Sequence, residues 1–410
     1  MDIPGLPARK GALKLLDAVL NRGETLDQAA HNALQGVHGQ ADRALARALA
    51  GEALRWLTDL DSLIDSATRQ ILPDDAKVRS VLRLMLAGWL RLETPPHAVI
   101  ATGLPLLTGG PRRLAHGVFS SLAKLAVSLP ATPTLPAVVL ERWGERAGAI
   151  SAGLAALPPL DLTLRDAGET AVWAERLGGT SLIPGHIRLG RGTAVENLEG
   201  FDEGAWWVQD LAASLPARLL GEGKGRTVLD LCAAPGGKTL QLAAAGWQVT
   251  ALDASAKRLE RVEQNLARTR LSAEVLVADA LQWEPAEPFD AVLLDAPCTA
   301  TGTCRRHPDV LHRIGERQIA EQAELQAALL DRAVQWVKPE GTLIYAVCSL
   351  EPEEGEMQAA AVALTPEPIR ADEAPNGIVP SSDGFVRTDP GMLSEQGGLD
   401  GFFIARWRKD

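Results

Sequence analysis

Two of the four cysteines in this chain stand just after separate apolar runs. The run at 289–294 leads through Asp295 to Cys298, and the run at 341–347 leads directly to Cys348. Short apolar runs with β-branched residues, bounded by Pro or Gly, indicate buried strands of a parallel sheet. Ligands of open α/β sheets bind at the carboxyl ends of the strands. The sequence therefore predicts two thiols at one sheet edge, where a thiolate could attack carbon.

A second group of small residues follows the apolar run at 227–231, in a turn that opens a helix. This turn contains Cys232, Ala233, Ala234, Pro235, Gly236, Gly237 and Lys238. Glycine lets the backbone approach a ligand, and the first turn of a helix offers free N–H groups. A Walker A loop would need Gly at position 232, and the dinucleotide fingerprint G-x-G-x-x-G is absent. The remaining interpretation is a loop that binds S-adenosylmethionine.

Acidic residues downstream fit that interpretation. Asp253, Asp279 and Asp295 each follow a strand-like run. Asp253 could accept from ribose hydroxyls and Asp279 from an adenine amino group, although Asp also caps helices in many proteins. Arg258 either packs near the adenosine or lies on a solvated helix face. Lys238 either contacts the cofactor carboxylate or a polyanionic partner such as RNA, or lies on a helix surface.

Strand-like and helical segments alternate along the second half of the chain, which favours an α/β fold with a doubly wound, Rossmann-like sheet. The strand-like segments are 227–231, 248–252, 274–278, 289–294 and 341–347. The helical segments between them are 238–245, 256–269, 316–337 and 353–364. We expect a catalytic domain at 205–410.

The first half of the chain differs. Apolar residues recur at three-to-four spacing, which predicts an all-helical domain at 1–130. Three prolines in 130–136 indicate a linker, and we expect a small α+β subdomain within 131–204.

Composition narrows the class of protein. The chain has 410 residues, 46% hydrophobic and 23% charged, as in ordinary globular proteins. No apolar run is long enough for a membrane span, and the N-terminus lacks a signal-peptide core, so we expect a cytoplasmic protein without a membrane partner. We also expect a monomer. The cysteines form no zinc-ligand pattern, so we expect reduced thiols and no metal. The net charge is −11, but the acids gather in the C-terminal stretch, so a local basic groove for nucleic acid is possible.

The motifs together resemble one family. Val208-Gln-Asp210, the loop from Cys232 to Lys238, Asp295-Ala-Pro-Cys298, Arg305-Arg306-His-Pro308-Asp309 and Tyr345-Ala-Val-Cys348-Ser349 are similar to motifs of the bacterial Sun/Fmu proteins of the NOL1/NOP2/Sun group. Glu354 and Glu356 stand in the acidic run of that family. The segment Asp42-Arg43-Ala-Leu-Ala-Arg47, with Arg55, resembles a NusB-type RNA-binding domain. Two positions depart from the family pattern: Val347 replaces a Thr, and Ala300 replaces a common Gly.

The resemblance implies an S-adenosylmethionine-dependent RNA cytosine-C5 methyltransferase acting on small-subunit rRNA. It also implies that Cys348 is the nucleophile, that Cys298 assists product release, and that Asp295 contacts the ring nitrogen N3 of cytosine. The residues alone leave the order of the two thiols open, since DNA cytosine methyltransferases attack with a Pro-Cys thiol, which favours Cys298. Arg305 and Arg306 are plausible phosphate contacts. Trp206 and Trp207 could stack on a base or pack in a core.

Two alternatives remain. One is a tRNA target for the same chemistry. The other is a non-catalytic RNA-binding factor for ribosome assembly, against which the presence of both Cys298 and Cys348 argues.

Overall fold

The computed structural model describes residues 3–190 and 195–410. The chain forms two compact units. The first comprises residues up to Ala156 together with a later segment, Cys304–Ile314. The second comprises Leu157–Thr303 and Gly315–Asp410.

The first unit is helical. Its helices are α1 (Leu6–Arg22), α2 (Leu26–Ala33), α3 (Gln40–Arg55), α4 (Leu57–Ser66), α5 (Lys77–Leu90), α6 (Pro96–Gly103), α7 (Gly109–Lys124), α8 (Ala137–Trp143), α9 (Ala147–Leu154) and α14 (Val310–Arg313). The spaced apolar residues form its core, where Leu49, Trp56 and Leu60 are almost fully buried. The proline-rich stretch between α7 and α8 forms neither helix nor strand. A helical N-terminal domain is therefore confirmed.

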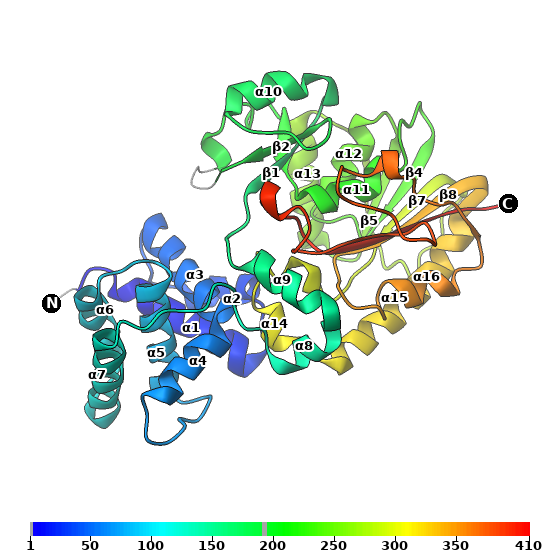
Figure 1. Cartoon of the computed structure of the whole chain (residues 1–410). Helices are drawn as coiled ribbons and strands as arrows, with labels where there is room; N and C mark the ends of the chain where they lie inside the picture. The colour runs from blue at the N-terminus through cyan, green and yellow to red at the C-terminus, as the bar shows by residue number, and fades with distance from the viewer. Residues whose placement is uncertain (1–2, 191–194) are drawn as a thin grey trace. The chain divides into compact units, whose positions relative to one another are not determined.

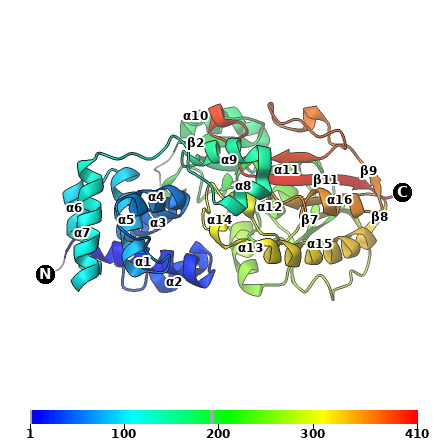
Figure 2. The same ribbon diagram turned by 60° about the horizontal axis from the view of Figure 1, so that its bottom comes forward.

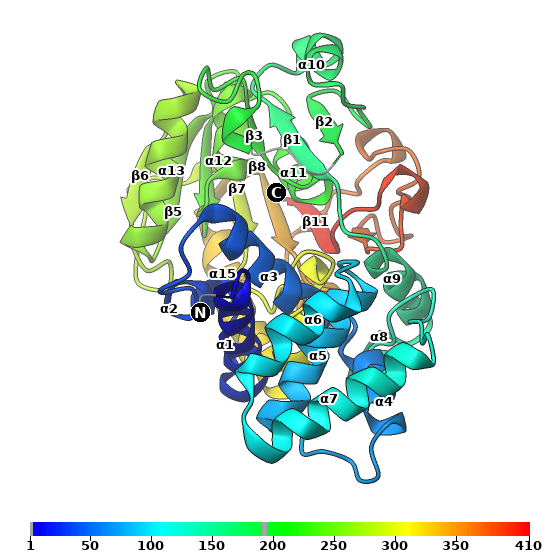
Figure 3. The same ribbon diagram turned by 90° about the vertical axis from the view of Figure 1, so that its left-hand side faces the viewer.

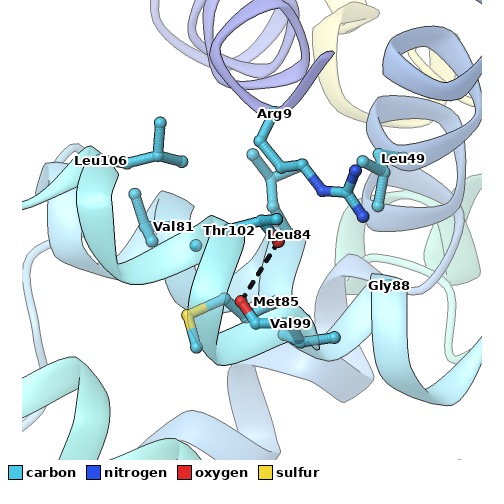
Figure 4. Close-up of a pocket in the computed structure, with 10 residues that line it drawn as sticks. Arg9, Leu49, Val81, Leu84, Met85, Gly88, Val99, Thr102 and Leu106 are labelled. Atoms are coloured by element: carbon cyan, nitrogen blue, oxygen red, sulfur yellow. Dashed lines mark hydrogen bonds between the residues drawn. The ribbon is translucent and has the colours of Figure 1, made fainter. Parts of the chain in front are cut away.

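An apolar pocket in this unit lies between α3, α5 and α6. Figure 4 shows the side chains of Leu49, Leu84 and Val99 around it, with Arg9 reaching toward Leu49. Burial lowers the pKa of the Arg9 guanidinium. The pocket is lined mostly by apolar residues, with Arg9 and Thr102 as its polar members, so it offers no chemistry comparable with that of the thiols.

Buried charges hold Cys304–Ile314 within the helical unit. Arg55 pairs with Glu52 (Nε–Oε1, 3.1 Å) and donates from Nη2 to the carbonyl of Arg305 at 2.8 Å. A ring nitrogen of His312 lies 2.7 Å from the carbonyl of Leu54. The sequence grouped Arg55 with a motif that resembles an RNA-binding domain, but its side chain is buried and paired inside the helical unit.

Replacing Arg55 with Met keeps most of the side-chain volume but leaves Glu52 and the Arg305 carbonyl without this partner. Arg91 still pairs with Glu52 at 2.9 Å, so we expect a loss of about 2–3 kcal/mol in the free energy of unfolding. Urea unfolding followed by circular dichroism measures this loss, and limited proteolysis should cut within 304–314 more rapidly than in the wild type. An unchanged unfolding curve and cleavage rate would contradict the role assigned to Arg55.

The second unit begins with a small antiparallel sheet, covered by α10 (Thr170–Leu177). Its order is β2-β1-β3, with β1 (Leu160–Leu164), β2 (His186–Leu189) and β3 (Trp206–Val208), as Figure 3 shows. Asp161 on β1 receives two hydrogen bonds from Arg188 on β2, both 2.7 Å long. These bonds and the Arg188 side chain hold the carboxyl pKa of Asp161 well below its usual range, against the effect of burial.

The large sheet has the order β10-β11-β8-β7-β4-β5-β6. Its strands are β4 (Thr227–Leu231), β5 (Gln248–Asp253), β6 (Glu274–Val277), β7 (Phe289–Asp295), β8 (Val337–Val347), β10 (Val386–Thr388) and β11 (Phe402–Arg408), with the short β9 (Thr365–Pro366) beside β11. Neighbours from β6 to β8 pair in parallel, whereas β11 and β10 add antiparallel pairs. Figure 2 shows β11, in red, running alongside β8. The predicted Rossmann-like α/β fold is confirmed.

Helices cover both faces of this sheet (Figure 1). They are α11 (Leu211–Arg218), α12 (Gly237–Ala244), α13 (Ala256–Thr269), α15 (Glu316–Trp336) and α16 (Glu356–Ala361). Alternate residues of each strand point to opposite faces of the sheet. Leu229 packs in the core on one face with α15, and Val228 packs in the core on the other face with α11. Helix α16 is shorter than the predicted 353–364, because residues 352–355 form turns beside the strand ends.

Candidate active site

The two thiols meet at the carboxyl ends of adjacent strands. Asp295, the last residue of β7, pairs in register with Ala346 of β8, and the Ala296 N–H donates to the Ala346 carbonyl at 2.9 Å. Cys298 follows three residues after Asp295, and Cys348 follows two residues after Ala346. The sulfurs of Cys298 and Cys348 lie 3.4 Å apart, within hydrogen-bond distance. The structure thus brings together the two residues that the sequence placed at one sheet edge.

The two thiols have different surroundings. The hydrogen bond with Cys348, burial, and the negative charges of Cys348 and Glu354 together raise the pKa of the Cys298 thiol well above its usual value. The Cys348 sulfur instead lies close enough to the Lys238 ammonium for their opposite charges to attract, which contributes to a raised Lys238 pKa. A cation thus lies near Cys348, whereas the anion beside Cys298 disfavours the Cys298 thiolate.

Lys238 joins the cofactor loop to the end of β7. Its Nζ lies 2.6 Å from Asp295 Oδ2, and its side chain is packed over the ring of Phe402 with only 8% of the residue exposed. Burial acts to lower the pKa of Lys238, but the charge and hydrogen bond of Asp295 outweigh it and the pKa is raised. Lys238 is therefore not a solvated helix-surface lysine, and it stays charged.

The loop between β4 and α12 is shaped for close approach of a ligand. Cys232 has φ 61° and Gly236 has φ 104°, so the backbone turns sharply through the left-handed region on both sides of Pro235. Helix α12 starts at Gly237 without a side-chain cap, which leaves its first N–H groups to another acceptor. Burial and the nearby Asp253 charge raise the pKa of Cys232 to about 12. The raised pKa disfavours a Cys232 thiolate, and Ala233 and Ala234 beside it are buried parts of the loop.

The predicted acids occupy different environments. Asp253 is buried at the end of β5, where it accepts from the N–H groups of Ser255 (2.9 Å) and Ala234 (3.3 Å). Arg258 donates to the Ala234 carbonyl at 2.8 Å and lies 3.4 Å from Asp253, so it braces the loop. Asp279 is exposed, and its carboxylate accepts from the N–H of Leu281 at 3.0 Å. Capping of the local turn thus explains in part why an Asp stands at position 279, apart from any contact with a cofactor.

Most of the other predicted residues are buried. Arg305 is buried in the helical unit with 2% of the residue exposed, so its prediction as a phosphate contact is wrong, whereas Arg306 is exposed. Trp206 and Trp207 are buried, and their ring N–H groups donate to the Glu199 carbonyl and the Gln209 side chain. They pack in the core rather than stack on a base.

Sequence reasoning assigned no role to two carboxylates that are buried near these strand ends. One is Glu354, described below. The other is Asp230, which accepts from the Thr239 hydroxyl at 2.6 Å, while its Oδ1 has no hydrogen-bond partner among the described residues. Burial raises the pKa of Asp230 to about 7. Its position near the end of a strand was visible in the sequence, but its complete burial was not.

The raised pKa of Asp230 predicts a pH-dependent stability. From about pH 4 to pH 7 the folded protein keeps a proton on Asp230 that the unfolded chain has lost, so the free energy of unfolding falls as pH rises through this window. Asp230→Asn cannot titrate, and we expect its melting temperature to fall by about 5 °C less than that of the wild type over the same window. Scanning fluorimetry from pH 4 to pH 8 measures the difference. Asp383→Asn, at an exposed carboxylate, serves as the control, and equal slopes for all three proteins would disprove the assignment.

The described residues also bear on metal binding and on membrane spanning. Among the described residues, no set of His, Cys, Asp and Glu side chains is placed to hold a metal ion. Within the same residues, no helix has the length and apolar character needed to cross a membrane.

Comparison with protein families gives two matches. The model described as 16S rRNA methyltransferase RsmB/F matches residues 217–408, and the NusB family model matches residues 6–106. Curated relatives cover nearly the whole chain. Ribosomal RNA small subunit methyltransferase B of Klebsiella pneumoniae is 35% identical over 97% of both chains, and that of Xylella fastidiosa is 34% identical over 99% of both.

Solved structures share the fold. The crystal structure of PH0851 superposes with a TM-score of 0.74 at 22% identity and covers 100% of both chains. The structure of NSun6 from Pyrococcus horikoshii with SFG has a TM-score of 0.58 at 18% identity and covers 67% of this chain and 98% of that one.

Proposed function

Because the chain belongs to the RsmB/F family of 16S rRNA methyltransferases, we propose that it methylates carbon 5 of a cytosine in 16S rRNA through a covalent bond from Cys348. The observation that carries this proposal is the contact of two thiols, 3.4 Å apart, beside the Asp295–Lys238 pair. The choice of rRNA over tRNA rests on the names of the curated relatives.

S-adenosylmethionine is the cofactor of this methyltransferase, and the residues at the ends of β4 and β5 fit it. The free N–H groups at the start of α12 and the backbone of 232–237 would hold its methionine part, and Asp253 would accept from its ribose hydroxyls. Asp279, being exposed, stays available to an adenine amino group. When bound, the cofactor supplies the electrophilic methyl group.

The chemistry that the protein must supply is activation of carbon 5, which is a poor nucleophile. The Cys348 thiolate adds to carbon 6 of the cytosine, the new S–C bond pushes electron density to carbon 5, and carbon 5 takes the methyl group. Solvent water then takes the proton from carbon 5, the electron pair of that C–H bond re-forms the double bond between carbons 5 and 6, and the S–C bond breaks to release Cys348 as a thiolate. One difficult step is thereby divided into easier ones.

Asp295 and Lys238 support the addition step. A carboxyl group at the end of β7 can hydrogen-bond N3 of the cytosine and share a proton with it as the ring gains electron density. The Lys238 ammonium, 2.6 Å from Asp295, holds that carboxyl in place and offsets its charge. The base must leave its stack to reach these groups, so the target nucleotide is single-stranded or flipped.

Cys298 keeps its proton, as its raised pKa requires, and stays in contact with Cys348. A protonated thiol beside the leaving sulfur can hydrogen-bond the Cys348 thiolate as the product departs. The opposite assignment, with Cys298 attacking as in Pro-Cys enzymes, would place the attacking charge beside Glu354. The charges around the two sulfurs therefore favour Cys348 as the nucleophile.

Trapping separates the two assignments. RNA carrying 5-fluorocytosine blocks loss from carbon 5, so the wild type should form a stable protein–RNA adduct seen by denaturing electrophoresis. We expect Cys348→Ala to abolish the adduct and Cys298→Ala to retain it, with slower release from ordinary RNA. An adduct in Cys348→Ala that is missing in Cys298→Ala would reverse the roles.

Cofactor binding separates an enzyme from an RNA-binding assembly factor. Isothermal titration calorimetry should detect S-adenosylmethionine binding to the wild type, weakened about tenfold or more in Asp253→Ala, because two hydrogen-bond acceptors for a ribose diol are worth at least 1.4 kcal/mol. Asp383→Ala is the control and should bind as the wild type does. RNA binding without any cofactor binding would favour the assembly factor. Bisulfite sequencing of RNA from a deletion strain would then identify the modified cytosine.

A further inference from the structure

Glu354 is a fully buried carboxylate at the junction of the two thiol-bearing loops. Its Oε2 accepts from the Thr299 N–H and from Gln326 Nε2, each at 2.9 Å. Its Oε1 accepts from the Ser349 hydroxyl at 2.7 Å and from the Thr299 hydroxyl. None of the residues that the structure describes forms an ion pair with Glu354, so hydrogen bonds alone compensate its buried charge.

The donors to this carboxylate are placed next to the reactive sulfurs. Thr299 directly follows Cys298, and Ser349 directly follows Cys348. Gln326, from α15, also donates to the Pro297 carbonyl at 2.8 Å, so the residue before Cys298 is tied to the same cluster. Any shift of the Glu354 carboxylate would therefore move the backbone beside both cysteines.

The backbone of Glu354 is fixed as well. The Tyr345 hydroxyl, on β8, donates to the Glu354 carbonyl at 2.6 Å. Tyr345 is itself buried in the sheet, packed near the ring of Phe403. The carboxylate is thus anchored to β8 through its own main chain and reaches across to the loop that follows β7.

A carboxylate satisfies this arrangement with every donor as it stands. Both oxygens accept, because Oε2 faces two N–H groups and Oε1 faces two hydroxyls. An amide has one accepting oxygen, and its NH₂ group could face only the hydroxyls, which can also accept. Glutamine therefore has the shape of glutamate and can still accept from the Thr299 N–H and from Gln326, but it carries no charge.

We propose that Glu354 is a positioning residue for methyl transfer, whose carboxylate ties the loop after Cys298 to the loop after Cys348 and so keeps the two thiols in contact. The inference deepens the proposed function and rests on it, since the thiols are the groups that act. Glu354 touches neither the base nor the cofactor in this role and acts through the two cysteines.

The charge of Glu354 adds a second effect. The groups that face Cys298 electrostatically are Cys348 and Glu354, and Tyr345 lies near enough to interact with it. The negative charge of Glu354 opposes ionisation of Cys298, while Lys238 attracts negative charge on Cys348. Glu354 therefore contributes to the inequality of the two thiols as well as to their contact.

Other contacts tie the loops independently, so a Glu354 variant should still fold. The Gly302 N–H donates to the Cys348 carbonyl at 3.0 Å, and the Leu350 N–H donates to the Thr301 hydroxyl at 3.0 Å. A Cβ at Gly302 would lie 2.0 Å from the Gly401 carbonyl oxygen, which shows how closely these backbones approach. Glu354→Gln removes one charge from a junction that is otherwise intact.

The experiment compares the full-length wild type with Glu354→Gln and with Glu353→Gln, an exposed neighbour that undergoes the same chemical change. Iodoacetamide labelling without RNA, read by peptide mass spectrometry from pH 6 to pH 10, reports each thiol separately. For Glu354→Gln we expect Cys298 to be labelled at least threefold faster at pH 8, with its pH midpoint moved downward. Glu353→Gln should match the wild type.

The second readout is the rate of adduct formation with 5-fluorocytosine RNA at saturating RNA. We expect Glu354→Gln to slow it tenfold or more while RNA affinity stays within twofold. Ser349→Ala, which removes one donor and keeps the charge, should slow the adduct less and leave the Cys298 pH midpoint unchanged. If Glu354→Gln fails to fold, Ser349→Ala tests whether the Glu354 carboxylate joins the two loops. A wild-type adduct rate in Ser349→Ala would then overturn the proposal.

Wild-type labelling profiles and adduct rates in Glu354→Gln would also overturn it. The two proposals can fail separately. If the wild type forms no adduct with RNA, the proposed methyl transfer is wrong, yet the labelling profiles without RNA still decide whether Glu354 governs the thiols.

Discussion

The parallel register between β7 and β8 is the constraint on which the site depends. Asp295 opposite Ala346 makes both strands end at the same level, so the two loops leave the sheet side by side. A slip of one residue would turn every side chain of one strand to the other face and would separate the cysteines. The register is secured by the apolar residues of both strands, which are buried on two faces by helices.

On this frame, charge distinguishes two chemically identical groups. The thiols lie in contact, so the charged groups near each sulfur are what distinguishes them. Lys238 reaches the site from the cofactor loop, and Glu354 reaches it from the turn before α16. The strand ends thus place the sulfurs, whereas residues from two other loops supply the charges around them. This separation explains why the cofactor loop contains a lysine that is paired with Asp295 instead of with solvent.

Sequence reasoning succeeded where the signal was periodic or attached to a strand end. The strands β4 to β8, the cofactor loop and the convergence of Cys298 and Cys348 follow from apolar runs and their boundaries. It failed where burial decides. Arg305 stands in a basic motif beside the reactive loop, but its side chain is buried in the helical unit because Cys304–Ile314 packs there. No local pattern marks that packing, since it depends on residues such as Arg55 that lie about 250 positions earlier.

The same limit applies to the carboxylates. Asp230, Asp253, Asp295 and Glu354 look alike in the sequence, yet their roles differ because their partners differ. Asp295 has a lysine, Asp253 has two backbone N–H groups, and Asp230 has a single hydroxyl and one unpartnered oxygen. Buried charge without a cation costs stability unless hydrogen bonds offset it. Glu354 has four such bonds and Asp230 has one, and burial raises the pKa of Asp230 to about 7.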